Sequence, residues 1–204
     1  MSPINAISRR QALKGSLMLP LVAGLGAASA SPSSARAVAA EPRRGSKVLI
    51  AYFTRTGNTR LIATQIARAR NAELFQIVPA DPYPEDYEAQ VAQATEERRR
   101  GYEPPLQALA PALSSYDTVF LGFPIWGTTA PSIIRSFLSN HDLSGKTLVP
   151  FITHGGYGLG SSLDVVAEHA PGARIIEAFS KACDQERETL AEVTQWLETT
   201  GVPR

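Results

Sequence analysis

Cysteine is almost absent from the sequence. The 204-residue chain contains a single one, Cys183, so no disulfide can form within it. The three histidines, His141, His154 and His169, are spread along the chain, and no cysteine–histidine cluster has the spacing of a zinc site. These absences exclude a disulfide-stabilised scaffold and argue against a structural metal. We interpret Cys183 as a structural or partly exposed thiol, and His141 and His169 as capping or surface residues near helix ends.

Several signature motifs of nucleotide-binding and hydrolytic enzymes are also missing. The sequence contains no Walker pattern Gly-x4-Gly-Lys-Ser/Thr and no nucleophile elbow Gly-x-Ser-x-Gly. A glycine-rich segment at residues 155–160 does not match Gly-x-Gly-x-x-Gly, and it follows the fourth predicted strand instead of the first. The sequence therefore gives no support to a P-loop NTPase, an α/β-hydrolase or a dinucleotide-binding Rossmann domain.

Basic residues are scarce in the part of the chain that can fold. The whole sequence has a net charge of +1, with 20 Lys and Arg and 19 Asp and Glu. From residue 47 onward it has 14 Lys and Arg against 18 Asp and Glu, which gives a net charge of −4. A nucleic-acid-binding domain usually keeps a basic face, so this balance argues against such a partner. The 158 residues from 47 to 204 are enough for one domain with a full core.

Most of the remaining basic residues lie in an N-terminal segment that has the features of an export signal. Residues 8–14, Ser-Arg-Arg-Gln-Ala-Leu-Lys, resemble a twin-arginine signal, although Ala12 stands where Phe is common. The apolar region after it, at about residues 15–28, is too short and too rich in Gly and Pro for a good membrane span. No cysteine lies near this region, so a lipoprotein anchor is not available.

Small residues after the apolar region offer cleavage sites behind Ala30, Ala37 or Ala40. We therefore predict a twin-arginine signal peptide and flexible lead-in at residues 1–40 and a folded domain at residues 47–204. The expected location is the periplasm or the exterior, without a stable membrane anchor. A disordered basic tail or an uncleaved anchor is the alternative interpretation of the same segment.

The folded part begins with a strand, a polar turn and a helix. Residues 48–53 form an apolar, partly β-branched run, which predicts a buried parallel strand. Residues 61–68 have apolar side chains at helical spacing. The six residues between them, Thr54-Arg55-Thr56-Gly57-Asn58-Thr59, therefore precede a helix, whose first N–H groups have no helical partner. Together with the helix dipole and the threonine hydroxyls, this turn predicts an anion site, most simply for phosphate.

The rest of the domain alternates between strands and helices. We predict further strands at residues 73–78, 118–122, 147–152 and 174–178, and further helices at residues 85–100, 132–140, 161–169 and 184–199. This alternation is typical of a doubly wound parallel sheet. The run Arg98-Arg99-Arg100 ends the second helix, where it complements the helix dipole; we interpret it as a solvated face, with a docking patch for an acidic partner as the alternative.

The turn after the first strand resembles the phosphate loop of the flavodoxin-like superfamily, Thr/Ser-x-Thr-Gly-x-Thr. Thr54, Thr56, Gly57 and Thr59 match each fixed position. The resemblance implies a five-stranded parallel sheet of order 2-1-3-4-5 with helices on both faces, and FMN as the cofactor. Response regulators share this fold, but they need acidic residues at the end of the first strand, where this chain has Tyr52-Phe53-Thr54.

Two later loops strengthen the resemblance, because ligands of such sheets bind where the loops after strands one, three and four meet. Pro124-Ile125-Trp126 resembles the Pro-Ile-Trp of a flavodoxin-like family, in which many members have a second Trp where this chain has Gly127. Thr153-His154-Gly155-Gly156 resembles the Thr-Ser-Gly-Gly that follows strand four in that family. The resemblance implies that FMN is bound by residues 54–59, 124–127 and 153–156.

Individual roles within these loops have alternatives. Trp126 is either a wall for the flat flavin ring or a core aromatic under the loop. His154 could supply a proton or a positive charge, or it is a solvent-facing loop residue. Tyr157 either stacks on the flavin or lies on the surface. Gly127 would let the backbone approach the flavin N5, and N–H groups of residues 153–156 would bind its pyrimidine oxygens.

Fold alone does not give function, and three classes stay open. The first is an exported electron carrier that serves a partner protein. The second is an FMN-dependent oxidoreductase that reduces a quinone or another small molecule with NAD(P)H. The third is a domain that has lost FMN. We favour electron transfer, because the loops are short and a substrate pocket usually needs extra walls or a second subunit. The redox partner is therefore a protein or a small-molecule electron acceptor.

Overall fold

The computed structural model of the chain describes residues 47–182 and 186–202. The predicted signal and lead-in at residues 1–40 lie outside the described residues, so the export signal stays a prediction. Cys183 also lies outside them. In the described part, no helix is long and apolar enough to cross a membrane.

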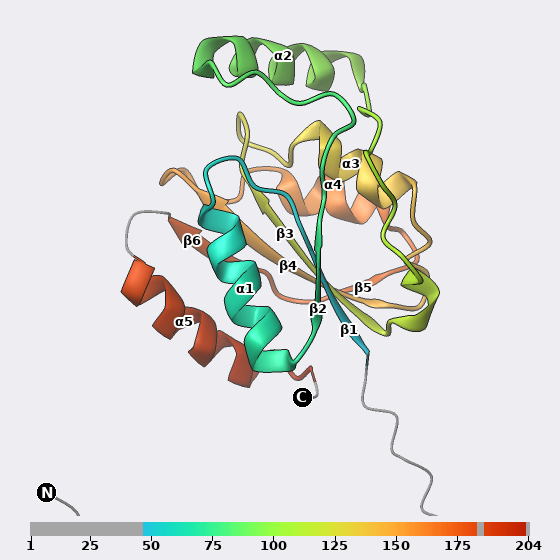
Figure 1. The fold of residues 1–204 in the computed structure, drawn as a ribbon, viewed down its shortest axis with the longest axis vertical. Helices are drawn as coiled ribbons and strands as arrows, with labels where there is room; N and C mark the ends of the chain where they lie inside the picture. The colour runs from blue at the N-terminus through green and yellow to red at the C-terminus, as the bar shows by residue number, and fades with distance from the viewer. Residues whose placement is uncertain (1–46, 183–185, 203–204) are drawn as a thin grey trace, which may run out of the picture. The chain divides into compact units, whose positions relative to one another are not determined.

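The centre of the fold is a parallel sheet (Figure 1). Its strands follow the order β2-β1-β3-β4-β5, and β6 also pairs with β4, which confirms the predicted order. β1 is central: all five of its residues are buried, and it pairs in parallel with β2 on one side and β3 on the other. The strands are β1 (Val48–Tyr52), β2 (Glu73–Gln76), β3 (Thr118–Pro124), β4 (Thr147–His154), β5 (Arg174–Ile175) and β6 (Phe179–Ala182).

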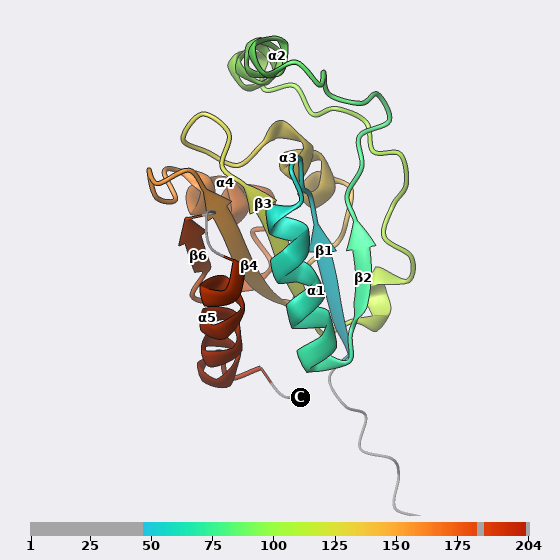
Figure 2. The same ribbon diagram turned by 60° about the vertical axis from the view of Figure 1, so that its left-hand side comes forward.

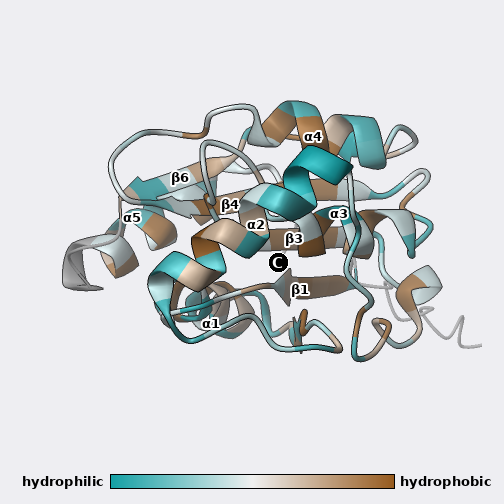
Figure 3. Cartoon of the chain, turned by 90° about the horizontal axis from the view of Figure 1, so that it is seen from above, coloured by the Kyte–Doolittle hydropathy of each residue, from teal (hydrophilic) through white to brown (hydrophobic). Residues whose placement is uncertain are grey.

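Helices cover both faces of the sheet, as predicted. The helices are α1 (Asn58–Arg70), α2 (Tyr87–Arg100), α3 (Ser132–Ser139), α4 (Ser162–His169) and α5 (Glu186–Thr199), with a short 3₁₀ helix η1 (Leu113–Ser115). Side chains alternate along β1, so Ile50 packs in the core with α1 and α5, and Leu49 in the core with α3 and α4. Figure 3 shows the central strands β1, β3 and β4 as largely hydrophobic between these layers.

The last strand differs from its prediction. A single strand over residues 174–178 is wrong, because the edge strand is divided into β5 and β6. Leu148 pairs with Ile175 and Phe151 pairs with Phe179, so β4 advances three residues while its partner advances four. The extra residue interrupts the ladder as a bulge does. β3 and β4 each extend two residues beyond their predicted ends, which brings Pro124 and His154 to the edge of the sheet.

The position of α2 could not be read from the sequence. Instead of covering a face, α2 lies across the carboxyl ends of the strands (Figures 1 and 2). Its first turn is capped by the Asp86 side chain, which accepts a hydrogen bond of 2.8 Å from the Ala89 N–H. Gly101 ends the helix in a left-handed conformation, with φ 63°. In the view from above, α2 lies in front of the sheet (Figure 3). The carboxyl ends of the strands are where ligands of open α/β sheets bind.

Candidate functional site

The loop after β1 leads into a helix N-terminus that no side chain caps. Gly57 adopts φ 97°, in the left-handed region, and is the N-cap of α1, but no side chain caps this helix. Thr54 Oγ1 accepts a hydrogen bond of 3.1 Å from the Gly57 N–H, which closes the turn. The first turn of α1 contains no acidic residue. In contrast to the capped α2, α1 therefore presents its first N–H groups and the positive end of its dipole to a ligand.

The loop after β3 holds Trp126 between the core and the site. The Ile125 N–H donates to the Thr153 carbonyl at 2.8 Å, which ties this loop to β4. The half-buried Trp126 ring contacts Phe53 and Tyr83 edge-on, with centroids 5.2 and 4.8 Å away. The same side chain lines the cleft described below. The two interpretations of Trp126 are therefore compatible: it packs against core aromatics and also forms a wall.

The loop after β4 is fixed by two further contacts. The hydroxyls of Thr59 and Thr153 lie 2.9 Å apart and are buried, so α1 and β4 are joined directly beneath the site. His154 is held on both ring nitrogens: Nδ1 accepts from the Gly156 N–H, and Nε2 lies 3.0 Å from Ser180 Oγ on β6. Nε2 therefore carries the proton and donates to Ser180. Tyr157 is 92% exposed and does not line the cleft.

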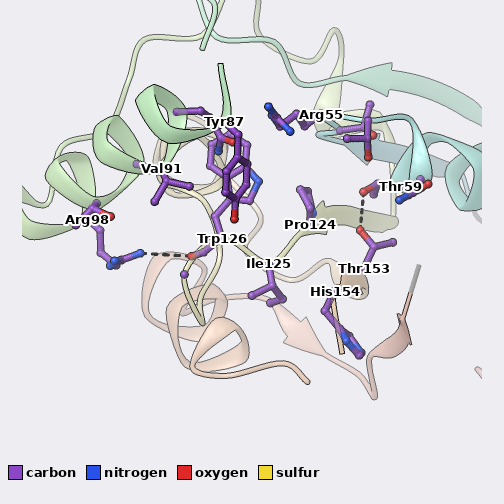
Figure 4. Close-up of a pocket in the computed structure, with 18 residues that line it drawn as sticks. Arg55, Thr59, Tyr87, Val91, Arg98, Pro124, Ile125, Trp126, Thr153 and His154 are labelled. Atoms are coloured by element: carbon purple, nitrogen blue, oxygen red, sulfur yellow. Dashed lines mark hydrogen bonds between the residues drawn. The ribbon is translucent and has the colours of Figure 1, made fainter. Parts of the chain in front are cut away.

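These three loops meet at one cleft of about 370 Å³ (Figure 4). Most of the residues predicted to bind the cofactor line it, whereas Gly57 and Gly156 do not. The lining residues from the predicted set are Thr54, Arg55, Thr56, Asn58, Thr59, Pro124, Ile125, Trp126, Gly127, Thr153, His154 and Gly155. The volume is in the range of small-molecule sites, and the loops contribute the polar groups at one end and apolar walls at the other.

One wall of the cleft was missed by the sequence reasoning. It is formed by α2, with Tyr87, Gln90, Val91, Ala94, Thr95 and Arg98. These positions recur every three or four residues, so they share one helix face. A possible signal was the apolar spacing of Tyr87, Val91 and Ala94, but Tyr87 is 67% exposed and Val91 42% exposed. Because this stripe covers a cleft and is not packed into a core, its periodicity alone did not reveal its role.

The arginine run at the end of α2 is divided between two roles. Arg99 and Arg100 form exposed salt bridges with Glu96, as expected for a solvated face. Arg98 instead reaches the loop after β3, where its Nη1 donates a 3.4 Å hydrogen bond to the Trp126 carbonyl (Figure 4). The prediction of a solvated face is therefore wrong for Arg98.

α2 is linked to Trp126 through Tyr83. The buried Glu97 carboxylate accepts 2.8 Å and 2.9 Å hydrogen bonds from the Tyr83 hydroxyl and the Gln93 side chain. Burial, together with the bond to Glu97, raises the pKa of the Tyr83 phenol, which therefore stays protonated and donates. Since Tyr83 also contacts Trp126, the position of α2 and the orientation of Trp126 depend on one another.

A second hollow, also about 370 Å³, lies on the other side of the first loop. It shares Thr54, Arg55, Thr56 and Trp126 with the cleft. Its remaining lining residues are Phe53, Gln76, Ile77, Val78, Pro79, Pro82, Tyr83, Pro84 and Glu85. No residue of the loop after β4 lines this second hollow. Of the two hollows, therefore, only the cleft is lined by all three loops.

The charges around the cleft have one sign. Arg55 lies beside the α1 N-terminus, where its Nη2 donates to the Glu85 carbonyl at 3.0 Å and its guanidinium lies 5.7 Å from the Tyr87 ring centroid. Tyr87 begins α2, and Arg98 lies in the last turn of the same helix. No Asp or Glu is among the described residues that line the cleft. The electrostatic field in the cleft therefore favours an anionic ligand.

His141, expected near a helix end, is a structural residue away from the cleft. Its Nδ1–H donates to the Phe137 carbonyl at 2.7 Å and its Nε2 accepts from the Ala110 N–H at 2.9 Å. Burial lowers the pKa of this imidazole. His141 therefore joins α3 to the segment before η1 in its neutral form.

Residues 47–200 match the protein family described as flavodoxin. A solved chain from Bacteroides eggerthii DSM 20697, assigned as a flavoprotein, is 33% identical with a TM-score of 0.68, over 78% of this chain and 99% of that chain. Another, from Bacteroides uniformis ATCC 8492 and assigned likewise, is 29% identical with a TM-score of 0.67, over 76% of this chain and 100% of that chain.

A third solved structure is a flavoprotein in complex with FMN from Lactobacillus acidophilus NCFM. It is 21% identical with a TM-score of 0.60, over 72% of this chain and 99% of that chain, a likeness that shows the fold. No curated protein matches the chain. The family match spans nearly the whole folded domain, and a relative at 33% identity is covered over almost its full length. The chain belongs to the flavodoxin family.

Proposed function

We propose that the domain binds FMN in the cleft and acts in electron transfer. The observation that carries the proposal is the meeting of three strand-end loops at one cleft, with the uncapped N-terminus of α1 at one end and Trp126 as a wall. The residues fit this cofactor: Gly57 opens the turn, the first N–H groups of α1 are free of side-chain caps, and no carboxylate lines the cleft. When bound, FMN would supply reversible redox chemistry.

Each loop would hold a different part of the cofactor. The hydroxyls of Thr54 and Thr56 and the N-terminus of α1 would bind the phosphate, with Arg55 adding positive charge. Trp126 would cover the flavin ring with an aromatic surface. Backbone groups of Thr153, His154 and Gly155 would serve the polar edge of the ring. The Thr59–Thr153 hydrogen bond would keep the phosphate end and the ring end in register.

The position of α2 favours a small molecule as the redox partner. The sequence suggested a carrier that serves a partner protein, because the loops offered no extra wall for a substrate. α2 supplies such a wall, with Tyr87, Val91 and Ala94 facing the loops across the cleft. An FMN-dependent oxidoreductase for a quinone or another small molecule is therefore our preferred form of the function, with NAD(P)H as one candidate reductant. A carrier between proteins is the second candidate.

The visible spectrum of the purified protein tests the cofactor. We expect a yellow protein that releases FMN, and not FAD, on heating, because the lining of the cleft includes one uncapped helix N-terminus, that of α1, for a phosphate group. A colourless protein that takes up no added FMN would refute the proposal. Turnover then separates the two forms of the function. NAD(P)H oxidation that depends on a small quinone supports the oxidoreductase, and negligible turnover with electron exchange only between proteins supports the carrier.

We also propose that the protein acts outside the cytoplasm, on the strength of the twin-arginine sequence at residues 8–14. Twin-arginine export moves folded proteins. That route suits a domain that folds around a cofactor before it leaves the cytoplasm, so the export proposal and the FMN proposal support one another.

A further inference from the structure

Arg98 is a positively charged residue of the cleft lining, and the proposed phosphate site gives it no role. Its Nη1 donates a hydrogen bond to the Trp126 carbonyl, and no carboxylate of the described residues pairs with it. Its neighbours Arg99 and Arg100 both bind Glu96 on the outer side of α2. A guanidinium has five N–H donors in a planar fork, so most of the donors of Arg98 remain available to a ligand.

The distance along α2 separates Arg98 from the phosphate end. Tyr87, whose ring lies under Arg55, is eleven residues before Arg98 on the same helix. At 1.5 Å per residue, the two ends lie about 16 Å apart along the helix axis. One phosphate at the N-terminus of α1 therefore cannot also neutralise Arg98. The cleft has two cationic ends, and the phosphate accounts for one of them.

Gly127 makes room for this arginine. A Cβ at residue 127 would lie 2.5 Å from Arg98 Nη1, so the guanidinium occupies the space of a side chain at this position. In the flavodoxin-like family that Pro124-Ile125-Trp126 resembles, many members have a second Trp at the position of Gly127. In this chain, the guanidinium of Arg98 on α2 lies in that space and contacts the Trp126 carbonyl.

We propose that Arg98 forms a second anion subsite in the cleft, distinct from the phosphate site, for the acidic group of a small aromatic carboxylate. The apolar body of the ligand would lie along Val91 and Ala94 of α2, and the planar guanidinium would bind the carboxylate with two N–H groups. This inference rests on the proposed function and names the class of small molecule that the cleft admits beside the cofactor.

Calorimetric titration of the FMN-loaded protein tests the subsite. The probe is 2-naphthoate, and its uncharged analogue is 2-naphthamide. Arg98→Gln should weaken naphthoate binding at least ten-fold, since a hydrogen bond to a charged group is lost. Arg99→Gln is the matched control, because it removes the same charge from the same helix end and should leave the affinity unchanged. Arg98→Lys should retain part of it, and 2-naphthamide should bind all four proteins equally weakly.

Three results would overturn the subsite. Arg98→Gln and Arg99→Gln could bind naphthoate equally, naphthoate and naphthamide could bind equally, or FMN and naphthoate could exclude one another. The last result, or a loss of FMN affinity in Arg98→Gln, would make Arg98 part of the cofactor site itself.

A second measurement needs neither FMN nor activity. In a Trp196→Phe background, iodide should quench Trp126 fluorescence more strongly when Arg98 is present, because the cation concentrates the anion beside the indole. Arg98→Gln should lower iodide quenching without changing quenching by neutral acrylamide, and Arg99→Gln should not. Equal iodide quenching in the two variants would refute a local anion subsite, whether or not the protein binds FMN.

Discussion

The hydrogen bond between Thr59 and Thr153 offers a quantitative test of how the site is held together. Thr59 is 1% exposed and Thr153 is 2% exposed, and their hydroxyl oxygens lie 2.9 Å apart. Thr59→Val has nearly the same shape and helix propensity, so it removes the hydrogen bond without opening a cavity. The Thr153 hydroxyl is then buried without this partner. A buried polar group left unsatisfied costs about 1–3 kcal/mol, and we expect that loss of unfolding free energy.

The double variant Thr59→Val with Thr153→Val gives a second test of this hydrogen bond. When both hydroxyls are replaced, no polar group remains unsatisfied, so Thr59→Val with Thr153→Val should be more stable than either single variant. The coupling energy of this cycle should be about 1 kcal/mol or more, because the two residues are in direct contact.

Urea unfolding of the cofactor-free protein is the appropriate assay, since bound ligand would add its own stabilisation. Thr64→Val is the control for the substitution in α1: its hydroxyl bonds only the Arg60 carbonyl of its own helix, and its effect should stay within about 0.5 kcal/mol. Single variants that lose no more stability than this control, or a double variant that loses the full sum of both, would contradict the proposed role of this hydrogen bond. FMN affinity should fall in the single variants as well, because the bond joins two loops of the cleft.

Three further predictions address the cofactor, pH and export. Thr56→Glu should weaken FMN binding at least about ten-fold, because a carboxylate would face the phosphate; fluorescence titration measures this, and an unchanged affinity would place the phosphate elsewhere. The lowered pKa of His141 means that the folded protein binds fewer protons than the unfolded chain, so stability should decrease as pH falls below about 6.5, by at most about 1.4 kcal/mol per pH unit. His141→Asn should flatten that decline in urea unfolding at several pH values, and an unaltered slope would show that another group causes it. Replacing Arg9 and Arg10 by lysine should leave precursor in the cytoplasm on cell fractionation; undiminished export would show that the twin-arginine assignment is wrong.

Local patterns in the sequence were sufficient for most of the fold. The buried run 48–53 and the helical spacing of 61–68 are properties of neighbouring residues, and they gave β1, α1 and the loop between them. The resemblance of Thr54–Thr59 then implied the strand order that the structure shows. The edge strand was less predictable, because the bulge between Ile175 and Phe179 depends on register against β4 and not on the composition of residues 174–178.

The meeting of the three loops at the cleft could also be predicted from the sequence. Loops that leave parallel strands at the same end must meet, so the approach of Thr56, Trp126 and His154 to one another follows from topology. The hydrogen-bond partners did not follow. The sequence left open whether His154 is free or held, and only the approach of β6 brings Ser180 to its Nε2.

The sequence by itself determined the fold class, the first strand, turn and helix, and the family, because each depends on residues that are close in the chain or on alternation that a parallel sheet enforces. The tertiary structure alone decided what α2 does. Long connections place this helix over the strand ends, where the buried Glu97 and the Tyr83 hydroxyl fasten it. That contact turns the side chains of Tyr87, Val91 and Arg98 toward the loops of the cleft, although these residues are far from those loops in the sequence. No local pattern encodes such a juxtaposition, because its energy comes from groups that are fourteen or more residues apart in the chain.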